Sequence, residues 1–264
     1  MSNFANIDPR IKYAQEVIKA DYGDTVSVAN KKKPLLKFGR NTNVGTATTG
    51  YTLWSTGADQ ANETYVATNV NSIDSISSSS ASDTIQVTVE GHTETGGNKT
   101  FVVQTVTLSG TTRVALTTPL NRATRVYNSN ADNLIGNVYV YQNTAITAGK
   151  PTDTTKIHLT VRAGKNQSEK ASTSLSSEDY WIITEFRASV LEKTSANADV
   201  ELQVRREGGV FRQLEDITAS SNSNGSIQFN PYVIIPPNSD VRLVAVASSA
   251  NTDISGSIQG YLAN

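Results

Sequence analysis

The sequence predicts an all-β protein of two antiparallel β-sandwich domains, the second jelly-roll-like, preceded by a short helix and an extended N-terminal arm. Apolar and polar residues alternate with a period of two through much of residues 51–264, the pattern of strands with one buried face. Gly, Pro and Asn separate these runs. The hydrophobic share of 37% is low, which suits thin sandwiches. We divide the chain into an arm (1–50), a small β domain (51–145) and a jelly-roll-like domain (152–264).

Residues 8–22 form the one convincing helical segment. Asp8 can cap it, Pro9 fits its first position and Gly23 is a natural stop. A helix of this length is marginal alone, so it needs a surface to lie on, its own or a partner's. The residues that would form its apolar face are Ile11, Ala14 and Ile18, with Tyr13 and Val17 beside them.

Residues 24–50 are expected to form an extended arm. Its centre, NKKKPLLKFGRN, interleaves basic with apolar side chains. One interpretation is a solvated, flexible tail; the other is an arm that docks on an acidic partner surface, with the apolar residues as anchors. The basic residues are Lys31, Lys32, Lys33, Lys37 and Arg40, and the apolar ones are Leu35, Leu36 and Phe38.

The small β domain is expected to contain a long hairpin over residues 83–108. Ile85, Val87 and Val89 alternate with polar residues and should face a core. The turn should be made by residues of positive φ, Gly96, Gly97 and Asn98. Shorter strands are expected at 111–117, 122–127 and 137–142, and a polar linker at 143–155 ends the domain.

The second β series gives seven or eight strands over about 110 residues, which favours a jelly roll. Val200, Leu202 and Val204 alternate strictly and should point inward. Pro236 and Pro237 mark a sharp loop, because proline does not fit a central strand. Trp181 lies in an apolar run and is expected to fill this core.

The stretch TLWSTG places Trp54 where the arm becomes the body. Two roles are open for this side chain. It can open the first strand and fill the core of the small β domain, or it can anchor the arm or an interface, where large aromatic residues contribute most to binding.

No motif predicts catalysis, a metal or a cofactor. The chain has no cysteine, and His92 and His158 are its only histidines, without a metal-ligand spacing. Adjacent acids, as at Glu178 and Asp179 or Glu215 and Asp216, point to opposite faces of a strand and do not make a glycosidase pair. Four further acids fall near turns, where aspartate commonly bonds to local backbone and where the alternative role is a calcium site: Asp132, Asp199, Asp240 and Asp253.

Charge and hydropathy argue against two classes of partner, nucleic acids and membranes. A net charge of −1 gives no overall field toward nucleic acid, and one short lysine cluster is a weak signal for it. The chain has no apolar run long enough to span a membrane and no apolar signal segment at its start. We therefore expect neither a nucleic-acid nor a membrane partner.

Five stretches together resemble a known group of proteins. They are Ser78–Thr84 (SSSASDT), Gln104–Thr112 (QTVTLSGTT), Asn121–Tyr127 (NRATRVY), residues 198–211 (ADVELQVRREGGVF) and residues 236–248 (PPNSDVRLVAVAS). Their order, within residues 35–262, is similar to that in a group of virion structural proteins of tailed bacteriophages, many of them marine. These are turn and strand patterns and carry no catalytic signature.

The resemblance implies a non-enzymatic capsid decoration (cement) protein in the virion, without a cofactor. Such a protein binds the major capsid protein on the outer shell and bridges capsomers, often as a trimer. The residues expected to contact the capsid are Lys31, Lys32, Lys33, Leu35, Leu36, Lys37, Phe38, Arg40 and Trp54. The alternative is a tail- or neck-associated module. Such a module would be structural, or it would bind host glycans through exposed Tyr139, Tyr141 and Tyr232. The third possibility is an enzyme, such as a glycan depolymerase.

Overall fold

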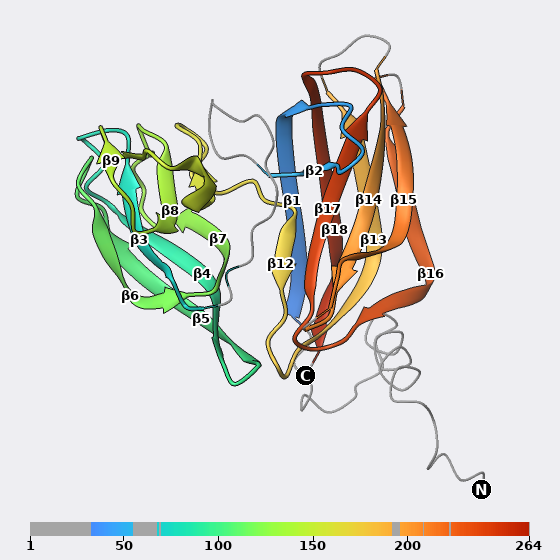
Figure 1. The fold of residues 1–264 in the computed structure, drawn as a ribbon, viewed down its shortest axis with the longest axis horizontal. Helices are drawn as coiled ribbons and strands as arrows, with labels where there is room; N and C mark the ends of the chain where they lie inside the picture. Colours follow the sequence, from blue (N-terminus) through green and yellow to red (C-terminus); the bar gives the residue numbers. More distant parts are fainter. Residues whose placement is uncertain are drawn as a thin grey trace, which may run out of the picture.

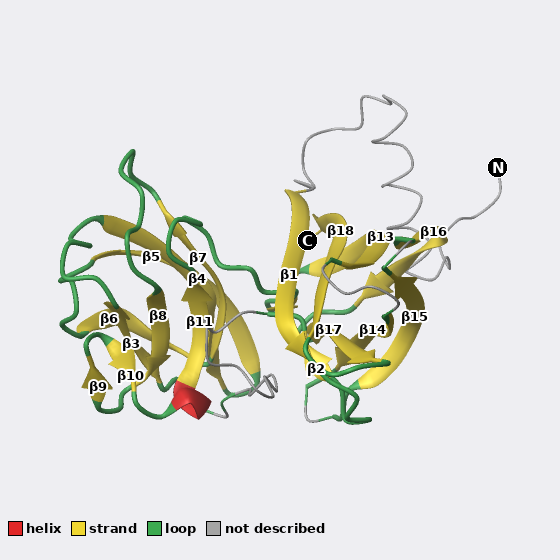
Figure 2. Ribbon diagram, turned by 90° about the horizontal axis from the view of Figure 1, so that it is seen from above, coloured by secondary structure: helices red, strands yellow, loops and turns green. Residues whose placement is uncertain are grey.

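The computed structural model describes residues 33–54, 68, 70–191, 196–207, 209–221 and 223–263. These residues fold into two β bodies that lie beside each other (Figure 1). Viewed from above, both bodies are built almost wholly of strands (Figure 2). The predicted all-β class with antiparallel sheets is confirmed. The helix expected over 8–22, and Lys31 and Lys32 of the expected arm, lie outside the described residues.

The C-terminal body is a jelly roll of two facing sheets. The chain passes back and forth between the sheets in the order typical of this fold. One sheet has the order β1-β18-β13-β16, with β1 at Lys33–Val44, β13 at Tyr180–Val190, β16 at Gly225–Ile235 and β18 at Thr252–Ala263. The other has the order β12-β17-β14-β15, with β12 at Ser172–Ser174, β14 at Asn197–Arg205, β15 at Arg212–Ser220 and β17 at Asp240–Ala247; β2, Tyr51–Thr52, also pairs with β17.

The other body is inserted into one strand of this jelly roll. Thr52 of β2 lies opposite Val244, and Ser172 of β12 lies opposite Arg242, so β2 and β12 occupy consecutive parts of β17. The amide of Ala171 donates to the carbonyl of Leu53 at 2.8 Å and holds the two ends together. The chain therefore leaves the jelly roll after Leu53 and returns to the same strand at Ala171.

The inserted sandwich has a four-stranded and a three-stranded sheet. The first has the order β11-β8-β3-β6, with β3 at Ile73–Ser78, β6 at Val114–Leu120, β8 at Val138–Gln142 and β11 at Ile157–Val161. The second has the order β5-β4-β7, with β4 at Gln86–Thr95, β5 at Asn98–Thr107 and β7 at Arg122–Asn128. A short hairpin of β9, Ile146–Thr147, and β10, Lys150–Pro151, and a 3₁₀ turn at Thr154–Lys156 precede β11.

Each body has its own hydrophobic core. Trp181, Val200 and Leu202 have no exposed surface and belong to the jelly-roll core, as the sequence pattern predicts. Val87 and Val89 are equally buried in the core of the inserted sandwich. Alternation therefore identifies inward side chains in both bodies, because a strand with one buried face repeats every second residue.

The long hairpin is present, with a tighter turn than expected. Gly96 and Gly97 have φ of 58° and 82°, the two central positions of a two-residue turn that needs positive φ. Asn98, expected to share this role, is instead the first residue of β5 and pairs with Thr95.

Two expected boundaries differ from the structure. Residues 33–44, expected in an extended arm, form β1, which pairs with β18 from Lys33 to Val44. Residues 157–161, expected in the second domain, form β11, which pairs with β8 of the inserted sandwich. Both differences have one cause: the chain begins the jelly roll before the insertion and completes it afterwards.

Candidate functional site at the junction of the two sandwiches

A buried carboxylate stands at the junction. Asp240, the first residue of β17, is 2% exposed. From the inserted sandwich, Lys99 Nζ donates to its Oδ1 at 3.2 Å and Arg122 Nε at 3.1 Å. From the jelly roll, Arg205 Nε donates to its Oδ2 at 3.1 Å, and the hydroxyl of Ser174 donates to Oδ1. Asp240 thus holds charges from both bodies.

The neighbouring cations keep Asp240 ionised. Burial would by itself raise the pKa of this carboxyl, but the charges of Arg122 and Lys99 lower the pKa below its ordinary value. Burial also lowers the pKa of Lys99, while Asp240 raises it again. Removing one partner from such a buried group leaves charge without compensation, which costs about 3–5 kcal/mol. The cluster therefore couples the two sandwiches.

Two further buried lysines cross the junction to backbone carbonyls. Lys37 of β1 donates from Nζ to the carbonyl of Thr124 at 2.6 Å. Lys170, which precedes β12, donates to the carbonyls of Ala123 and His158 at 3.0 and 2.9 Å. Burial lowers the pKa of Lys37 to about 8, with Glu90 opposing the shift. These bonds fix the jelly roll against β7 and β11.

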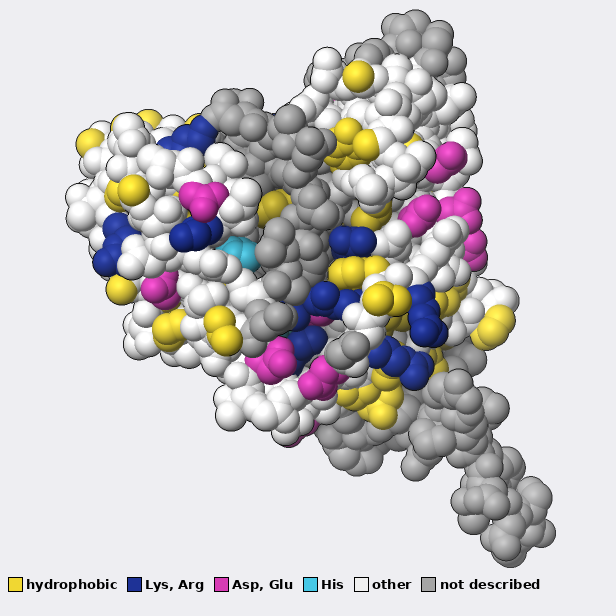
Figure 3. Space-filling model, in the orientation of Figure 1, with side chains coloured by type: hydrophobic (Ala, Val, Ile, Leu, Met, Phe, Trp, Pro, Cys, Tyr) yellow, Lys and Arg dark blue, Asp and Glu magenta, His cyan; other side chains and the backbone are white. Residues whose placement is uncertain are grey.

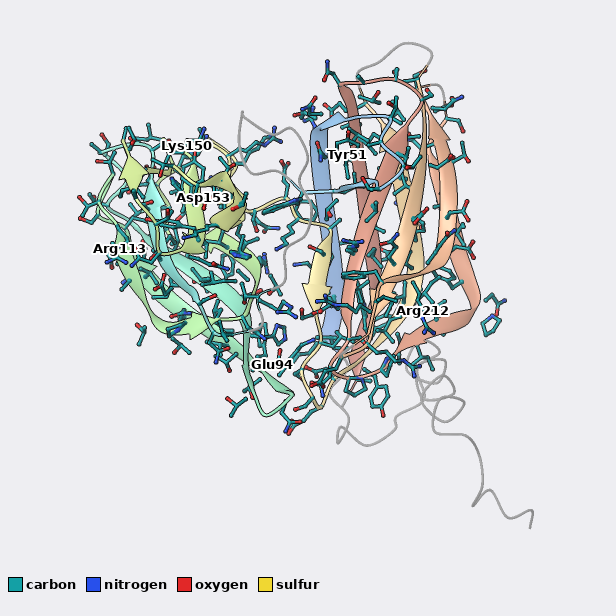
Figure 4. All side chains as sticks on the ribbon, in the orientation of Figure 1. Tyr51, Glu94, Arg113, Lys150, Asp153 and Arg212 are labelled. Carbon is teal, nitrogen blue, oxygen red and sulfur yellow. The ribbon has the colours of Figure 1, made fainter. Side chains whose placement is uncertain are left out.

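Trp54 stands where the chain leaves the jelly roll. It is 5% exposed, forms an antiparallel bridge with Lys170, and has the Lys170 Nζ 5.0 Å from its ring centroid. This distance suits a cation–π contact. The expectation that Trp54 opens a strand of the small β domain is wrong: Tyr51–Thr52 pairs with β17, and Leu53 belongs to the jelly-roll core. Figure 4 labels Tyr51 on this segment.

A groove of about 650 Å³ lies between the bodies. One wall is the first half of β1, from Lys33 to Phe38, and the other includes Glu90, His92, Phe101 and Arg125. In Figure 3, basic and acidic side chains gather along this boundary next to hydrophobic ones. Figure 4 places Glu94 on the β4–β5 hairpin, beside the junction. The groove is therefore both apolar and charged.

His92 in this groove is a neutral imidazole. It is 3% exposed, and burial, assisted by the charge of Lys99, lowers its pKa to about 3. Its ring is tilted against Phe101, with centroids 5.3 Å apart. A general acid or base works best with a pKa near the operating pH. His92 is thus poorly suited to proton transfer.

Within the part of the chain that the structure describes, no group of three His, Cys, Asp or Glu side chains could hold a metal ion. The adjacent acids make local bonds: Asp179 accepts from Ser176 Oγ at 2.6 Å, and Asp216 from Gln213 at 2.8 Å. No helix among the described residues is long and apolar enough to cross a membrane.

The residues expected to contact a capsid are dispersed over different environments. Leu36 is 56% exposed and Lys33 is exposed at the groove. Phe38 is half-buried in the same wall, and Leu35 packs against the jelly-roll core. Arg40 donates from Nε to Asp253 at 2.9 Å. Lys37 and Trp54 are buried in the junction as described above, so they are unsuited to the exposed contact expected of them.

The tyrosines expected to bind glycans are also placed differently. Tyr139 and Tyr141, expected to be exposed, are 3% and 0% exposed. Tyr232 is half-buried and packs against Ile182 on the outer face of the jelly roll. The alternation of the segment NVYVYQ does not reveal that both faces of β8 are covered.

Sequence reasoning does not find the charge cluster. It groups Asp240 with aspartates that serve turns, and no pattern singles out Lys99 or Arg122. The one local signal is the pair of prolines shortly before Asp240. It indicates that a new strand begins there and that its first residue is charged. Its partners are separated from it by 141 and 118 residues, and no sequence pattern connects them.

No protein-family model matches the chain, and no curated protein matches its sequence. Among solved structures, the Gt strain of infectious bursal disease virus matches with 12% identity over 88% of this chain and 72% of that one, with a TM-score of 0.23. The Gx strain matches with 10% identity over 91% and 73%, with a TM-score of 0.24. TM-scores this low do not establish a shared fold or function.

Proposed function

We propose that this chain is a non-enzymatic virion structural protein, a capsid decoration (cement) protein that binds the major capsid protein on the outer shell. The observation that carries the proposal is the buried charge cluster around Asp240, together with the resemblance in sequence. A cement protein must hold neighbouring capsomers at a fixed spacing. Two sandwiches joined through one split strand and coupled by buried ion pairs form a rigid spacer of this kind.

The mouth of the groove supplies the contact surface in this proposal. Lys33 and Leu36 on β1 are exposed, and Phe101 on β5 across the groove is 47% exposed. Apolar anchors beside a cation fit a capsid segment that carries apolar and acidic residues, since complementary charge orients partners and apolar burial holds them. A trimer, as the resemblance implies, would present three such grooves to adjacent capsomers.

Shell binding by purified full-length protein tests this surface. Leu36→Asp places a charge in the proposed contact and should weaken binding to undecorated shells about tenfold or more, the effect of losing ~1.4 kcal/mol. The matched control is Val210→Asp, which alters a side chain that is 71% exposed between β14 and β15. It should bind as wild type does. Equal binding of both variants and wild type would exclude the groove as the capsid contact.

A further inference from the structure

The outer face of one jelly-roll sheet carries an apolar band at one end. Pro34, Tyr261, Ile182 and Ile234 lie opposite one another on β1, β18, β13 and β16, in one row across the sheet. Ile182 faces outward, because Trp181 and Ile183 on either side of it belong to the inner core. With strands about 4.8 Å apart, the row spans about 14 Å.

Packing at this band resembles a core more than a surface. Ile182 has no exposed surface, and Ala263 is 3% exposed. Tyr232, Ile234 and Tyr261 are half-buried around them. The next row of the same face is polar on three strands, with Gln259, Glu185 and Gln228 opposite one another, whereas its member on β1 is the exposed Leu36. Across β18, β13 and β16 the apolar surface is therefore confined to the end of the sheet where β1 begins.

The chain arrives at this end from residues 1–32. Lys33 lies opposite Leu262, one residue from Tyr261, and Figure 1 shows the C-terminus beside the start of β1. Residues 24–32 could span at most about 30 Å when extended, about twice the width of the band. Ile11, Ala14 and Ile18 would span about 10 Å along the axis of the predicted helix, which fits within the band.

We propose that the apolar face of residues 8–22 binds the outer band around Ile182 in the same polypeptide. Ile11, Ala14 and Ile18 would lie against Tyr232, Ile234 and Tyr261, and the polar row at Gln228 and Gln259 would mark the edge of the contact. Such packing stabilises a helix that is too short to persist alone. It also fixes the start of β1, one wall of the groove. The inference does not depend on the proposed function.

Cysteine cross-linking in the full-length protein tests the contact directly, because the chain has no cysteine of its own. The test pair is Ile18→Cys with Tyr261→Cys, joined by a short bis-maleimide at low protein concentration. The control pair is Ile18→Cys with Leu191→Cys, since Leu191 is exposed just beyond the other end of β13, about 30 Å along the strand from Ile182. We expect an intramolecular cross-link in the test pair and much less in the control.

Two other outcomes overturn the proposal. Cross-linked dimers without intramolecular product would assign the band to the segment of a second copy. Equal reaction of test and control pairs would show no defined contact. A second measurement does not depend on forming a cross-link: the rate at which maleimide labels the thiol in a Tyr261→Cys protein. Adding Ile11→Asp should raise this rate severalfold, because it weakens the contact that covers the thiol. Adding Lys12→Asp, the matched control, should leave the rate unchanged. An unchanged rate with Ile11→Asp would contradict the proposal.

Discussion

Lys99 of the inserted sandwich reaches Asp240 of the jelly roll with Nζ 3.2 Å from Oδ1, and neither side chain is more than 3% exposed. This pair joins residues of two bodies that share no core cluster. Arg122 supports it from the same side, and Arg205 and Ser174 from the other. The relative placement of the bodies thus depends on a buried carboxylate and buried cations that compensate one another's charge.

Asp240→Asn should destabilise the protein by about 3–5 kcal/mol, because it leaves Lys99, Arg122 and Arg205 in the junction without a carboxylate. Urea unfolding followed by tryptophan fluorescence measures the change. Asp216→Asn, at an exposed position of β15, removes the same charge and should alter stability by less than about 0.5 kcal/mol. Equal small effects for both variants would mean that the cluster does not couple the sandwiches.

His92 should make the fold sensitive to acid. Its pKa is about 3 in the folded protein against 6.5 in the unfolded chain, so the unfolded chain binds a proton first as the pH falls. Stability is therefore lost between pH 6.5 and 3, by about 3 kcal/mol at about pH 4.5. His92→Gln should remove this part of the pH dependence, which chemical unfolding of both proteins at neutral and acid pH would reveal. Parallel curves for the two proteins would contradict the prediction.

Lys37 should make the stability of the fold depend on pH in the alkaline range. Its folded pKa of about 8 lies below the ordinary 10.5, so the unfolded chain binds more protons between these values. Stability should rise with pH across this window, by up to about 3 kcal/mol from this residue. Lys37→Met should lack that rise. The measurement is the difference in unfolding free energy between wild type and variant; a constant difference from pH 8 to 10 would refute the assignment.

Trp54→Ala should cost about 3–5 kcal/mol, the range for removing a large buried aromatic side chain. Trp54→Phe keeps a ring beneath Lys170 and should recover part of that loss. Thermal unfolding compares the two. A loss well under 1 kcal/mol for the alanine variant would show that the indole does not support the junction.

The parts of the fold that depend on local pattern are predictable from the sequence. Alternation identifies Val87 and Val200 as core residues, the apolar run identifies Trp181, and the Gly96–Gly97 pair identifies the hairpin turn. The split strand is beyond such reasoning, because β1 and β2 pair with strands some two hundred residues later, and no period along the chain encodes that. The prediction that Lys37 is an exposed contact residue is wrong for the same reason. A charged side chain is expected in solvent, and only the structure shows that Lys37 is buried and donates to the carbonyl of Thr124.

The most direct test of the proposed function is the copy number of this chain in purified particles, measured by quantitative mass spectrometry against the major capsid protein. We predict a stoichiometry close to that of the capsid protein, as expected for a decoration layer over the whole shell. A few to a few tens of copies per particle would contradict this and would place the chain at the neck or tail.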